Sequence, residues 1–363
     1  MSGKPILEVK NLRVEFPSRR GTLLALDDIS FDIAPGEVLG VVGESGAGKS
    51  LTGAAIIGLL EPPGRVAGGE IRFDGQRIDN LPYEQMRQLR GRHIGAIFQD
   101  PLTSLNPLYT VGRQIMETIQ THLPVGAEEA RRRAIRLLEE TGIPAAAQRI
   151  DQYPHQFSGG MRQRVVIALA LAAEPRLIVA DEPTTALDVS IQAQIIGLIK
   201  RLCREHGAAV MLVTHDMGVI AETCDRVAVM YAGRIAEIGP VHDVIHAPAH
   251  PYTVGLMGSI PAMDSDRERL LQIDGAMPRL NAIPRGCAFN PRCPQAEDRC
   301  RNDRPDLMDA GRTRAACWKP GSAGTSAARI LAADAAVAAA LAASTSASTA
   351  ASTAAAAAAG KTE

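Results

Sequence analysis

The fold is decided by one stretch of eight residues, Gly43-Glu44-Ser45-Gly46-Ala47-Gly48-Lys49-Ser50. It fits G-x-x-x-x-G-K-[ST] in full, and it lies between a strand-like apolar run, VLGVV, and a helix-like stretch that begins at Leu51, LTGAAIIGLL. Its glycines let the backbone N–H groups wrap an anion, and the start of the following helix adds favourable partial charge. Lys49 is expected to bridge the β- and γ-phosphates, and the Ser50 hydroxyl to bind Mg²⁺. The stretch therefore predicts a site for ATP or a similar nucleotide on an α/β fold.

A second element supports this prediction. LIVADE (Leu177–Glu182) is an apolar strand that ends in two carboxylates. Asp181, at the tip of the strand, can hold Mg²⁺ through water, and Glu182 can polarise the attacking water as a general base. An apolar strand that ends in two acids is common by itself. Together with the phosphate loop, it predicts that the nucleotide is hydrolysed.

Length and composition narrow the class of protein. The 363 residues suggest about two domains, and 46% hydrophobic with 22% charged residues is ordinary for a soluble globular protein. The 39 Lys+Arg and 40 Asp+Glu leave a net charge of −1, which argues against a protein built mainly to neutralise a nucleic-acid backbone. No long uncharged apolar run predicts a membrane span, and the first residues lack a secretory signal. A cytosolic location is expected.

The chain is patterned unevenly. Alternation and short apolar runs predict strands over 6–16, 29–33, 38–42, 177–180 and 209–213, the last three buried in a parallel sheet. Between about 100 and 173 the pattern is helical, with an amphipathic helix over 128–141. Residues 321–363 are mostly Ala, Ser and Thr, which predicts a solvated, disordered tail. A membrane anchor is the alternative for the tail, although Arg329 and Asp334 interrupt it.

Another motif brings a resemblance. FSGGMRQR (Phe157–Arg164) precedes Asp181 by about twenty residues and resembles the signature of ATP-binding cassette (ABC) ATPases. Its serine and glycines open a helix-like stretch, where N–H groups and a hydroxyl can bind an anion. The resemblance implies that this anion site completes the ATP site of a partner cassette, through the residues Ser158, Gly159, Gly160 and Met161.

The same resemblance assigns four further residues. Gln99 is similar to the Q-loop glutamine, which touches Mg²⁺ and contacts a membrane partner, and Asp188 is similar to the D-loop aspartate. His215 resembles the switch histidine that reaches the γ-phosphate, and Phe16 the aromatic residue that stacks on adenine. The alternatives are a core role for Phe16 and a structural hydrogen bond for His215.

A narrower resemblance covers about residues 5 to 320. FQDPLTSLNPLYTVG, YPHQFSGGMRQR, VMYAGRIAEIG and HPYTVGLMGSIP are similar to ATPases of oligopeptide and dipeptide importers, in the "D" type that pairs with a different "F" type. The partners implied are two transmembrane permease subunits, a second, non-identical ABC ATPase and, indirectly, a peptide-binding protein. The location implied is peripheral, on the cytoplasmic face of the inner membrane. The particular peptide is not indicated.

Four of the six cysteines gather near the C-terminus, at Cys287, Cys293, Cys300 and Cys317. Four thiolates suit Zn²⁺ or an iron–sulfur cluster, but the spacing matches neither the close pairs of zinc sites nor bacterial ferredoxins. Free thiols are the third possibility. The resemblance implies a [4Fe–4S] cluster held by these four residues. Because they lie outside the nucleotide motifs, their loss is expected to leave ATP binding largely intact.

These observations combine into one prediction. The fold is α/β, a P-loop NTPase (RecA-like) core with an antiparallel β subdomain, an inserted α-helical signature subdomain and a small Cys-rich C-terminal module. The expected domains are 1–255 for nucleotide binding, with the helical subdomain at about 100–173, then the module at 256–320 and the tail at 321–363. The expected function is ATP hydrolysis that powers peptide import. The alternative is a soluble ABC ATPase acting on nucleic acid or ribosomes, although the chain has one cassette and no sustained heptads.

Overall fold

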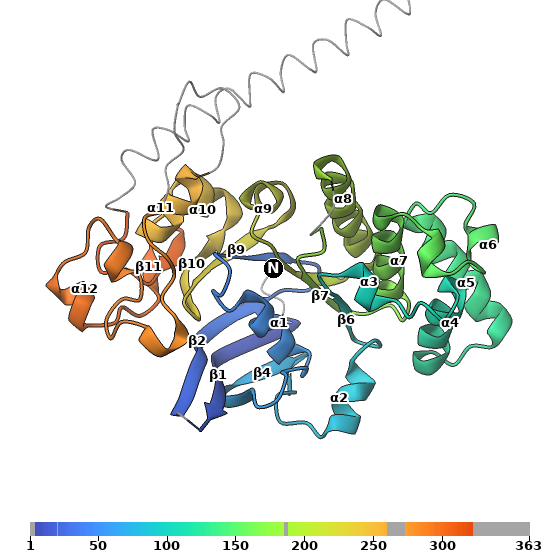
Figure 1. Ribbon diagram of the computed structural model, residues 1–363, viewed down its shortest axis with the longest axis horizontal. Coiled ribbons are helices and arrows are strands. Elements are labelled where there is room, and N and C mark those ends of the chain that lie inside the picture. The colour runs from blue at the N-terminus through green and yellow to red at the C-terminus, as the bar shows by residue number, and fades with distance from the viewer. Residues whose placement is uncertain (1–3, 20, 185–187, 260–272, 322–363) are drawn as a thin grey trace, which may run out of the picture.

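The computed structural model describes residues 4–19, 21–184, 188–259 and 273–321. The predicted Ala-rich tail lies outside the described residues, apart from Gly321. The described chain forms a small sheet and a large sheet, with helices around them (Figure 1). Among the described residues, no helix combines the length and the apolar character that a membrane span requires.

The small sheet is antiparallel, in the order β2-β1-β4-β5. The alternating pattern at 6–16 and the run at 29–33 lie in its two longest strands, so both strand predictions are confirmed, although the strands extend further. The buried side chains of these strands face the large sheet and α1 in a common apolar core. The strands are β1 (Leu7–Ser18), β2 (Gly21–Ile33), β4 (Arg65–Phe73) and β5 (Gln76–Arg77).

The large sheet has eight strands in the order β11-β12-β10-β9-β3-β8-β7-β6. Its central strands are parallel and apolar, and every residue of β3 and β8 is buried, which confirms the three predicted parallel strands. The strands are β3 (Val38–Val42), β6 (Ile94–Ile97), β7 (Leu177–Asp181), β8 (Ala209–Val213), β9 (Arg226–Tyr231), β10 (Arg234–Pro240), β11 (Met308–Ala310) and β12 (Thr313–Ala315).

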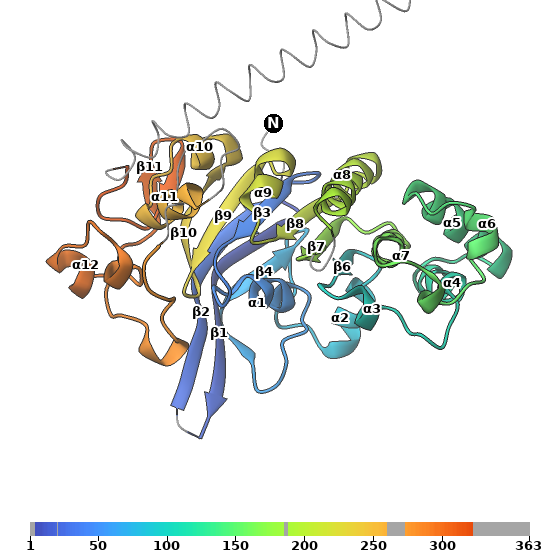
Figure 2. The same cartoon turned by 45° about the horizontal axis from the view of Figure 1, so that its top comes forward.

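Figures 1 and 2 show the helices in three groups: beside the β6 edge of the large sheet, along the sheets, and at the opposite edge of the large sheet. One group, residues 101–171, lies beside the β6 edge of the large sheet, and we call it the helical lobe. It contains α3 (Pro101–Ser104), α4 (Val111–His122), α5 (Ala127–Glu140), α6 (Ala146–Arg149), η1 (Pro154–Gln156) and α7 (Gly159–Leu171). The amphipathic helix predicted over 128–141 is α5, with Ala130, Ala134 and Leu138 on its buried face, so this prediction is confirmed.

The remaining helices lie along the sheets and at the opposite edge. Two of them follow the strands that carry predicted site residues, namely α1 after β3 and α9 after β8. They are α1 (Lys49–Ile56), α2 (Tyr83–Leu89), α8 (Val189–His206), α9 (Met217–Thr223), α10 (Val241–His246), α11 (Pro251–Gly258), η2 (Leu280–Ala282), η3 (Asn290–Arg292) and α12 (Asp298–Asn302).

Residues 273–321, which we call the C-terminal segment, continue the large sheet. β12 pairs with β10 through Glu237↔Ala315, and β11 pairs with β12. The buried Glu237 carboxylate accepts hydrogen bonds from the backbone N–H groups of Ala249 and His250 and from the Thr313 hydroxyl. Burial raises the pKa of Glu237, and these donors oppose the shift. The segment is therefore fastened to the core by backbone pairing and by a buried carboxylate.

Candidate functional site

The phosphate loop connects β3 to α1 through backbone conformations that only glycine adopts readily. Gly48 caps α1 with φ 103°, and Gly43 has φ 151°. A Cβ on Gly43 would lie 2.2 Å from the carbonyl oxygen of Met230, and one on Gly48 would lie 2.6 Å from Leu26. Gly43 is thus required by close packing on backbone as well as by conformation, whereas Gly48 is required by conformation. The loop closes tightly over the ends of β3 and β9.

Lys49 lies inside this loop and is only 6% exposed. Its ammonium group donates to the carbonyl oxygens of Gly43 at 2.9 Å and Glu44 at 3.1 Å. Burial lowers the pKa of Lys49, while the charges of Glu182, Asp181 and Glu44 oppose the shift. A buried cation that is held by backbone carbonyls can exchange them for phosphate oxygens, which carry more negative charge.

Five predicted residues come together at the C-terminal ends of the parallel strands. Ser50 Oγ donates to Asp181 Oδ1 at 2.9 Å. Gln99 Nε2 donates to Glu182 Oε2 at 3.0 Å, and His215 Nδ1 lies 3.5 Å from Glu182 Oε1. Gln99 follows β6, the two acids end β7 and His215 follows β8, so neighbouring strands deliver them to one edge. This edge of an open parallel sheet is where ligands bind in α/β folds.

The two acids at the end of β7 differ in what acts on them: burial affects the charge of Asp181, and the backbone of Glu182 is strained. Burial raises the pKa of Asp181, which the hydrogen bond from Ser50 opposes. A cation beside Asp181 would offset the cost of its buried charge, and hydroxyl and carboxylate oxygens are the ligands that Mg²⁺ prefers. Glu182 instead has φ 44°, a left-handed conformation that costs about 1–3 kcal/mol outside glycine. The residues present therefore fit Mg²⁺ at Asp181 and a separately held carboxylate at Glu182.

Phe16 and Leu51 line one pocket with Ser50 and Asp181. Phe16 is half-buried, and its ring packs so closely on Gly64 that a Cβ there would lie 2.7 Å from the ring. The structure thus places Phe16 on the wall of a pocket that is continuous with the phosphate loop, rather than inside the core.

The signature residues lie apart from these groups. Ser158 caps α7, and its hydroxyl accepts from the Met161 backbone N–H at 3.4 Å. Gly159 and Gly160 form the first turn, where a Cβ on Gly160 would lie 3.1 Å from Ile191 of α8. Asp188 is exposed at the start of α8, and the neighbouring residues 185–187 lie outside the described part of the chain. In both ribbon views α7 belongs to the helical lobe and α1 does not (Figures 1 and 2).

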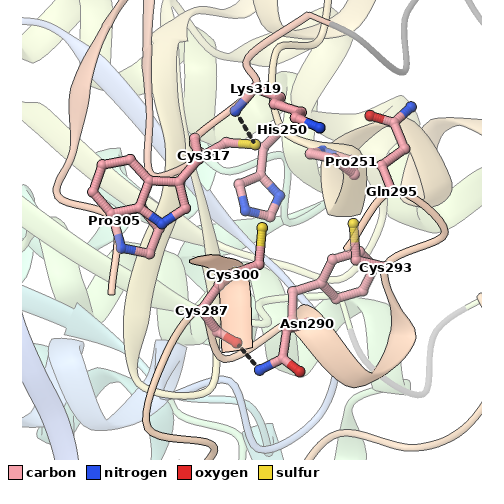
Figure 3. A pocket seen from close by; sticks show the side chains of 12 residues that line it. His250, Pro251, Cys287, Asn290, Cys293, Gln295, Cys300, Pro305, Cys317 and Lys319 are labelled. Carbon is pink, nitrogen blue, oxygen red and sulfur yellow. Dashed lines mark hydrogen bonds between the residues drawn. The ribbon is translucent and has the colours of Figure 1, made fainter. Parts of the chain in front are cut away.

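All four predicted cysteines line one pocket, together with His250 (Figure 3). Burial raises the pKa of Cys287 to about 11, and the other three thiols add to the shift. In the portion of the chain described here, no three His, Cys, Asp or Glu side chains are grouped so as to hold a metal ion. The described residues thus show no preformed site for a single metal ion, and the [4Fe–4S] cluster stays a prediction.

Two residues that the sequence does not identify contact the phosphate loop. Arg292 Nη1 lies 2.9 Å from Glu44 Oε1, and the Glu44 backbone N–H donates to Tyr252 Oη at 2.9 Å. Tyr252 is within the HPYTVGLMGSIP stretch, and Arg292 directly precedes Cys293. Neither stretch carries a motif for nucleotide binding, so no local pattern could have indicated these contacts.

Comparison with known families gives two matches. Residues 26–185 match the family described as ABC transporter, and residues 236–300 match the oligopeptide/dipeptide transporter C-terminal region. The second match includes Arg292 and three of the four clustered cysteines.

Comparison with individual proteins agrees. The chain is 48% identical to the oligopeptide transport ATP-binding protein OppD of Salmonella typhimurium, over 87% of this chain and 94% of that protein. It is also 48% identical to the dipeptide transport ATP-binding protein DppD of Escherichia coli, over 87% of this chain and 97% of that protein.

Solved structures share the fold. An ATP-binding cassette dimer, MJ0796, in a post-hydrolysis state bound to ADP and Pi, superposes with a TM-score of 0.59 at 30% identity, covering 65% of this chain and 98% of that one. The cassette cbiO1 of Clostridium perfringens gives 0.57 at 31% identity, covering 67% and 91%. The architecture is the ABC ATPase cassette, and the chain belongs to the ABC transporter family, among the ATP-binding proteins of oligopeptide and dipeptide transporters.

Proposed function

We propose that this chain is the ATP-hydrolysing subunit of a peptide importer. The observation that carries the proposal is the meeting of Ser50 with Asp181, and of Gln99 and His215 with Glu182, beside a phosphate loop that holds a buried lysine. The relatives named for oligopeptide and dipeptide transport supply the cargo class. They do not favour the alternative, an ABC ATPase that acts on nucleic acid or ribosomes.

Each residue then has a chemical role. Lys49 turns from the Gly43 and Glu44 carbonyls to the phosphates, and Phe16 provides a flat apolar wall for the base. Bound Mg²⁺ neutralises phosphate charge, with Ser50, Asp181 and Gln99 as its residues on the protein. Glu182 accepts a proton from the attacking water, while the Gln99 amide and His215 hold its two carboxylate oxygens in place. The His215 side chain is 68% exposed, so it can exchange its contact with Glu182 for one with a phosphate oxygen.

The signature residues act on a second nucleotide. Ser158, Gly159, Gly160 and Met161 present N–H groups at the start of α7, a helix of 13 residues. Since this turn lies in the helical lobe, it would complete the site of a partner cassette, with Asp188 near the same face. A cassette with this fold has been solved as a dimer. We propose a non-identical second ATPase as the partner.

Exposed apolar side chains near Gln99 support permease partners. Phe98, Leu102 and Leu108 are 46%, 63% and 78% exposed. Large apolar side chains are unfavourable in contact with water, so this segment favours a partner that covers it. We propose that two transmembrane permease subunits cover them, on the cytoplasmic face of the inner membrane, with a peptide-binding protein acting through the permeases. The division into 1–255, 256–320 and 321–363 is part of the same proposal.

Reconstitution tests this function. The chain alone is expected to hydrolyse ATP slowly, and hydrolysis is expected to rise when the permeases and the second ATPase are added in lipid vesicles. Peptide-loaded binding protein should raise it again and drive labelled peptide into the vesicles. Stimulation by RNA, DNA or ribosomes, with none by the permeases, would favour the alternative.

A second proposal concerns the four cysteines. We propose that their pocket holds a [4Fe–4S] cluster. Four thiols line one pocket, and the thiolates of a cubane bind four different irons, so they need not crowd together as ligands of one ion do. Anaerobically purified protein is then brown, with about four irons and four sulfides per chain. C287S, C293S, C300S and C317S should each weaken the colour, whereas C203S and C224S should not. Colourless protein with one zinc would replace the cluster by zinc, and metal-free protein would contradict both.

A further inference from the structure

The C-terminal segment reaches the phosphate loop through one buried arginine. Arg292 ends η3, and its side chain is only 6% exposed. Its Nη1 donates to both carboxylate oxygens of Glu44, at 2.9 and 3.1 Å, and lies 3.4 Å from the Tyr231 hydroxyl. Glu44 is the second residue of the phosphate loop, and its side chain is 30% exposed, so a partly buried, charged hydrogen bond joins the two regions.

The guanidinium of Arg292 is held on its other sides as well. Its Nε donates to the carbonyl oxygen of Asp274 at 2.9 Å, and Nη2 donates to that of Ile273 at 3.2 Å. The rings of Tyr231 and Phe289 lie 5.8 and 6.0 Å from the guanidinium carbon. A guanidinium with fixed donors loses little further freedom when it binds a carboxylate. Arg292 is therefore a preformed clamp for Glu44.

Tyr252 holds the backbone of the same loop residue. Its hydroxyl accepts from the Glu44 N–H at 2.9 Å, and the side chain is fully buried. Its ring packs against those of Tyr231 and Phe289 at 4.6 and 5.4 Å. The carbonyl of Glu44 in turn accepts from Lys49 at 3.1 Å. One loop residue thus connects the buried lysine to two side chains that come from outside the nucleotide motifs.

Arg292 and Tyr252 do not line the cysteine pocket themselves, but each is next to residues that do. Arg292 directly precedes Cys293, and Phe289 lines the pocket. His250, also in the wall, caps α11 by accepting from the Tyr252 N–H at 3.0 Å (Figure 3). These neighbours give a physical route by which the packing of the pocket can reach the residues that hold Glu44. The prediction that loss of the cysteines leaves ATP binding largely intact stays a prediction, and the experiments below test it.

We propose that Arg292 is a positioning residue for ATP binding, which holds the phosphate loop through Glu44 and so makes ATP affinity depend on the packing of the cysteine pocket. The inference rests on the proposed ATP site, but it holds whether the pocket contains a metal or free thiols. Arg292 would contact neither the nucleotide nor the attacking water, and it would act only through the phosphate loop.

The first experiment measures the affinity of the purified full chain for a fluorescent ATP analogue. R292Q should weaken binding roughly 10–100-fold, because the partly buried Glu44 carboxylate in the phosphate loop loses its charged partner. R292K keeps the charge but not the fork of donors, so it should recover part of the affinity. R304Q is the matched control. Arg304 ties the same segment to Asp27 and Asp28 of β2, and its loss should leave ATP affinity within about 2-fold of the parent.

A double-mutant cycle separates positioning from general stability. E44Q should weaken binding ~5–10-fold, and R292Q should cost no more than about 3-fold in the E44Q background, because the charge on the Glu44 side of the contact is already removed. Equal costs of R292Q in both backgrounds would overturn the proposal. If R292Q fails to fold, E44Q carries the test, and unchanged ATP affinity in E44Q overturns it too.

K49A separates a failure of the proposed ATP site from a failure of the role proposed for Arg292. If K49A binds the analogue like the parent, the proposed ATP site is wrong and the inference falls with it. If K49A loses binding while R292Q and E44Q keep it, only the inference is wrong.

The second experiment reads the coupling in the opposite direction. Since coupling between two sites is reciprocal, bound ATP analogue should raise the protection of the amides of residues 287–293 against hydrogen exchange ~5-fold in the parent, and not in the E44Q/R292Q double variant. This readout needs no free thiol, so it applies with or without a metal in the pocket. Helix α5 of the helical lobe is the internal reference. Exchange of residues 287–293 that ignores ATP in the parent would overturn the coupling to the pocket.

Discussion

The helical lobe and the C-terminal segment lie at opposite edges of the large sheet, and they relate differently to the phosphate loop (Figure 1). The signature turn of the lobe packs on α8, where Gly160 faces Ile191. The C-terminal segment contacts the loop directly, through Arg292 and Glu44. Under the proposed function, one edge of the molecule would present a site to a partner, whereas the other edge would support the chain's own site.

This comparison separates two kinds of defect. A change in the lobe should spare nucleotide binding by the isolated chain and affect the assembled transporter. A change at the C-terminal edge should already affect binding in the isolated chain. Four predictions test this separation, beginning with the largest effect.

The largest effect on ATP turnover is expected at Glu182, which lies between the helical lobe and the C-terminal segment. E182Q should lower ATP turnover of the assembled transporter by ~10²–10⁴, the usual contribution of a positioned general base, because an amide cannot accept the proton from water. ATP binding should persist and trap a closed pair of cassettes, which size-exclusion chromatography with ATP would detect. Hydrolysis at the parental rate would show that Glu182 is not the base.

The lobe itself is tested at Ser158. S158A should reduce hydrolysis in the assembled transporter by ~10²–10³, the typical cost of removing one donor to a reacting oxyanion. The isolated chain should bind ATP as before, because the affected site belongs to the partner. S158T keeps the hydroxyl and is the control. Loss of ATP affinity in isolated S158A would break the comparison between the two regions.

The third prediction, at Lys49, measures the effect of a change in the chain's own ATP site. K49A removes the fixed cation near the phosphates, so ATP affinity of the isolated chain should fall by roughly 10–100-fold, as for loss of a charged hydrogen bond. Titration with a fluorescent ATP analogue measures it, and transport should fall in parallel. The buried position of Lys49 makes a thermal-denaturation control necessary. Unchanged affinity would contradict the assignment of the loop.

The smallest effect is expected at Phe16. Stacking of a base on an aromatic ring contributes about 1–3 kcal/mol, so F16A should weaken ATP binding, while F16W should restore it. Binding of triphosphate alone should not distinguish F16A from the parent. If F16A lowers the melting temperature and leaves ATP affinity unchanged, Phe16 is a core residue and the adenine role is wrong.

Much of the nucleotide-binding core could be predicted from sequence because its signals are local. A strand, a glycine-rich turn and a helix within residues 38–60 define the loop, and the buried strands appear as continuous apolar runs. The position of Asp181 and Glu182 could also be predicted, because residues at the end of a parallel strand lie at the ligand-binding edge of the sheet. These features depend on neighbouring residues and on the geometry of one strand or turn.

The C-terminal edge could not be predicted in this way. Arg292 and Glu44 are 248 positions apart, and neither belongs to a periodic pattern that would pair them. The cysteine pattern predicted that the four thiols gather, but not that residues next to their pocket contact the phosphate loop. The prediction that ATP binding is independent of the cysteines was based on sequence position, which does not give distance in space.

The sequence by itself determined the elements of the cassette, the loop, the acids and the family resemblance, because dihedral preference and side-chain period act over a few residues. Only the tertiary structure decided which distant groups meet. The pairing of β12 with β10 brings the C-terminal segment to the sheet, and the burial of Tyr231, Tyr252 and Phe289 then sets Arg292 against Glu44. The physical reason is that long-range contacts follow from strand order and core packing, which depend on the whole chain at once.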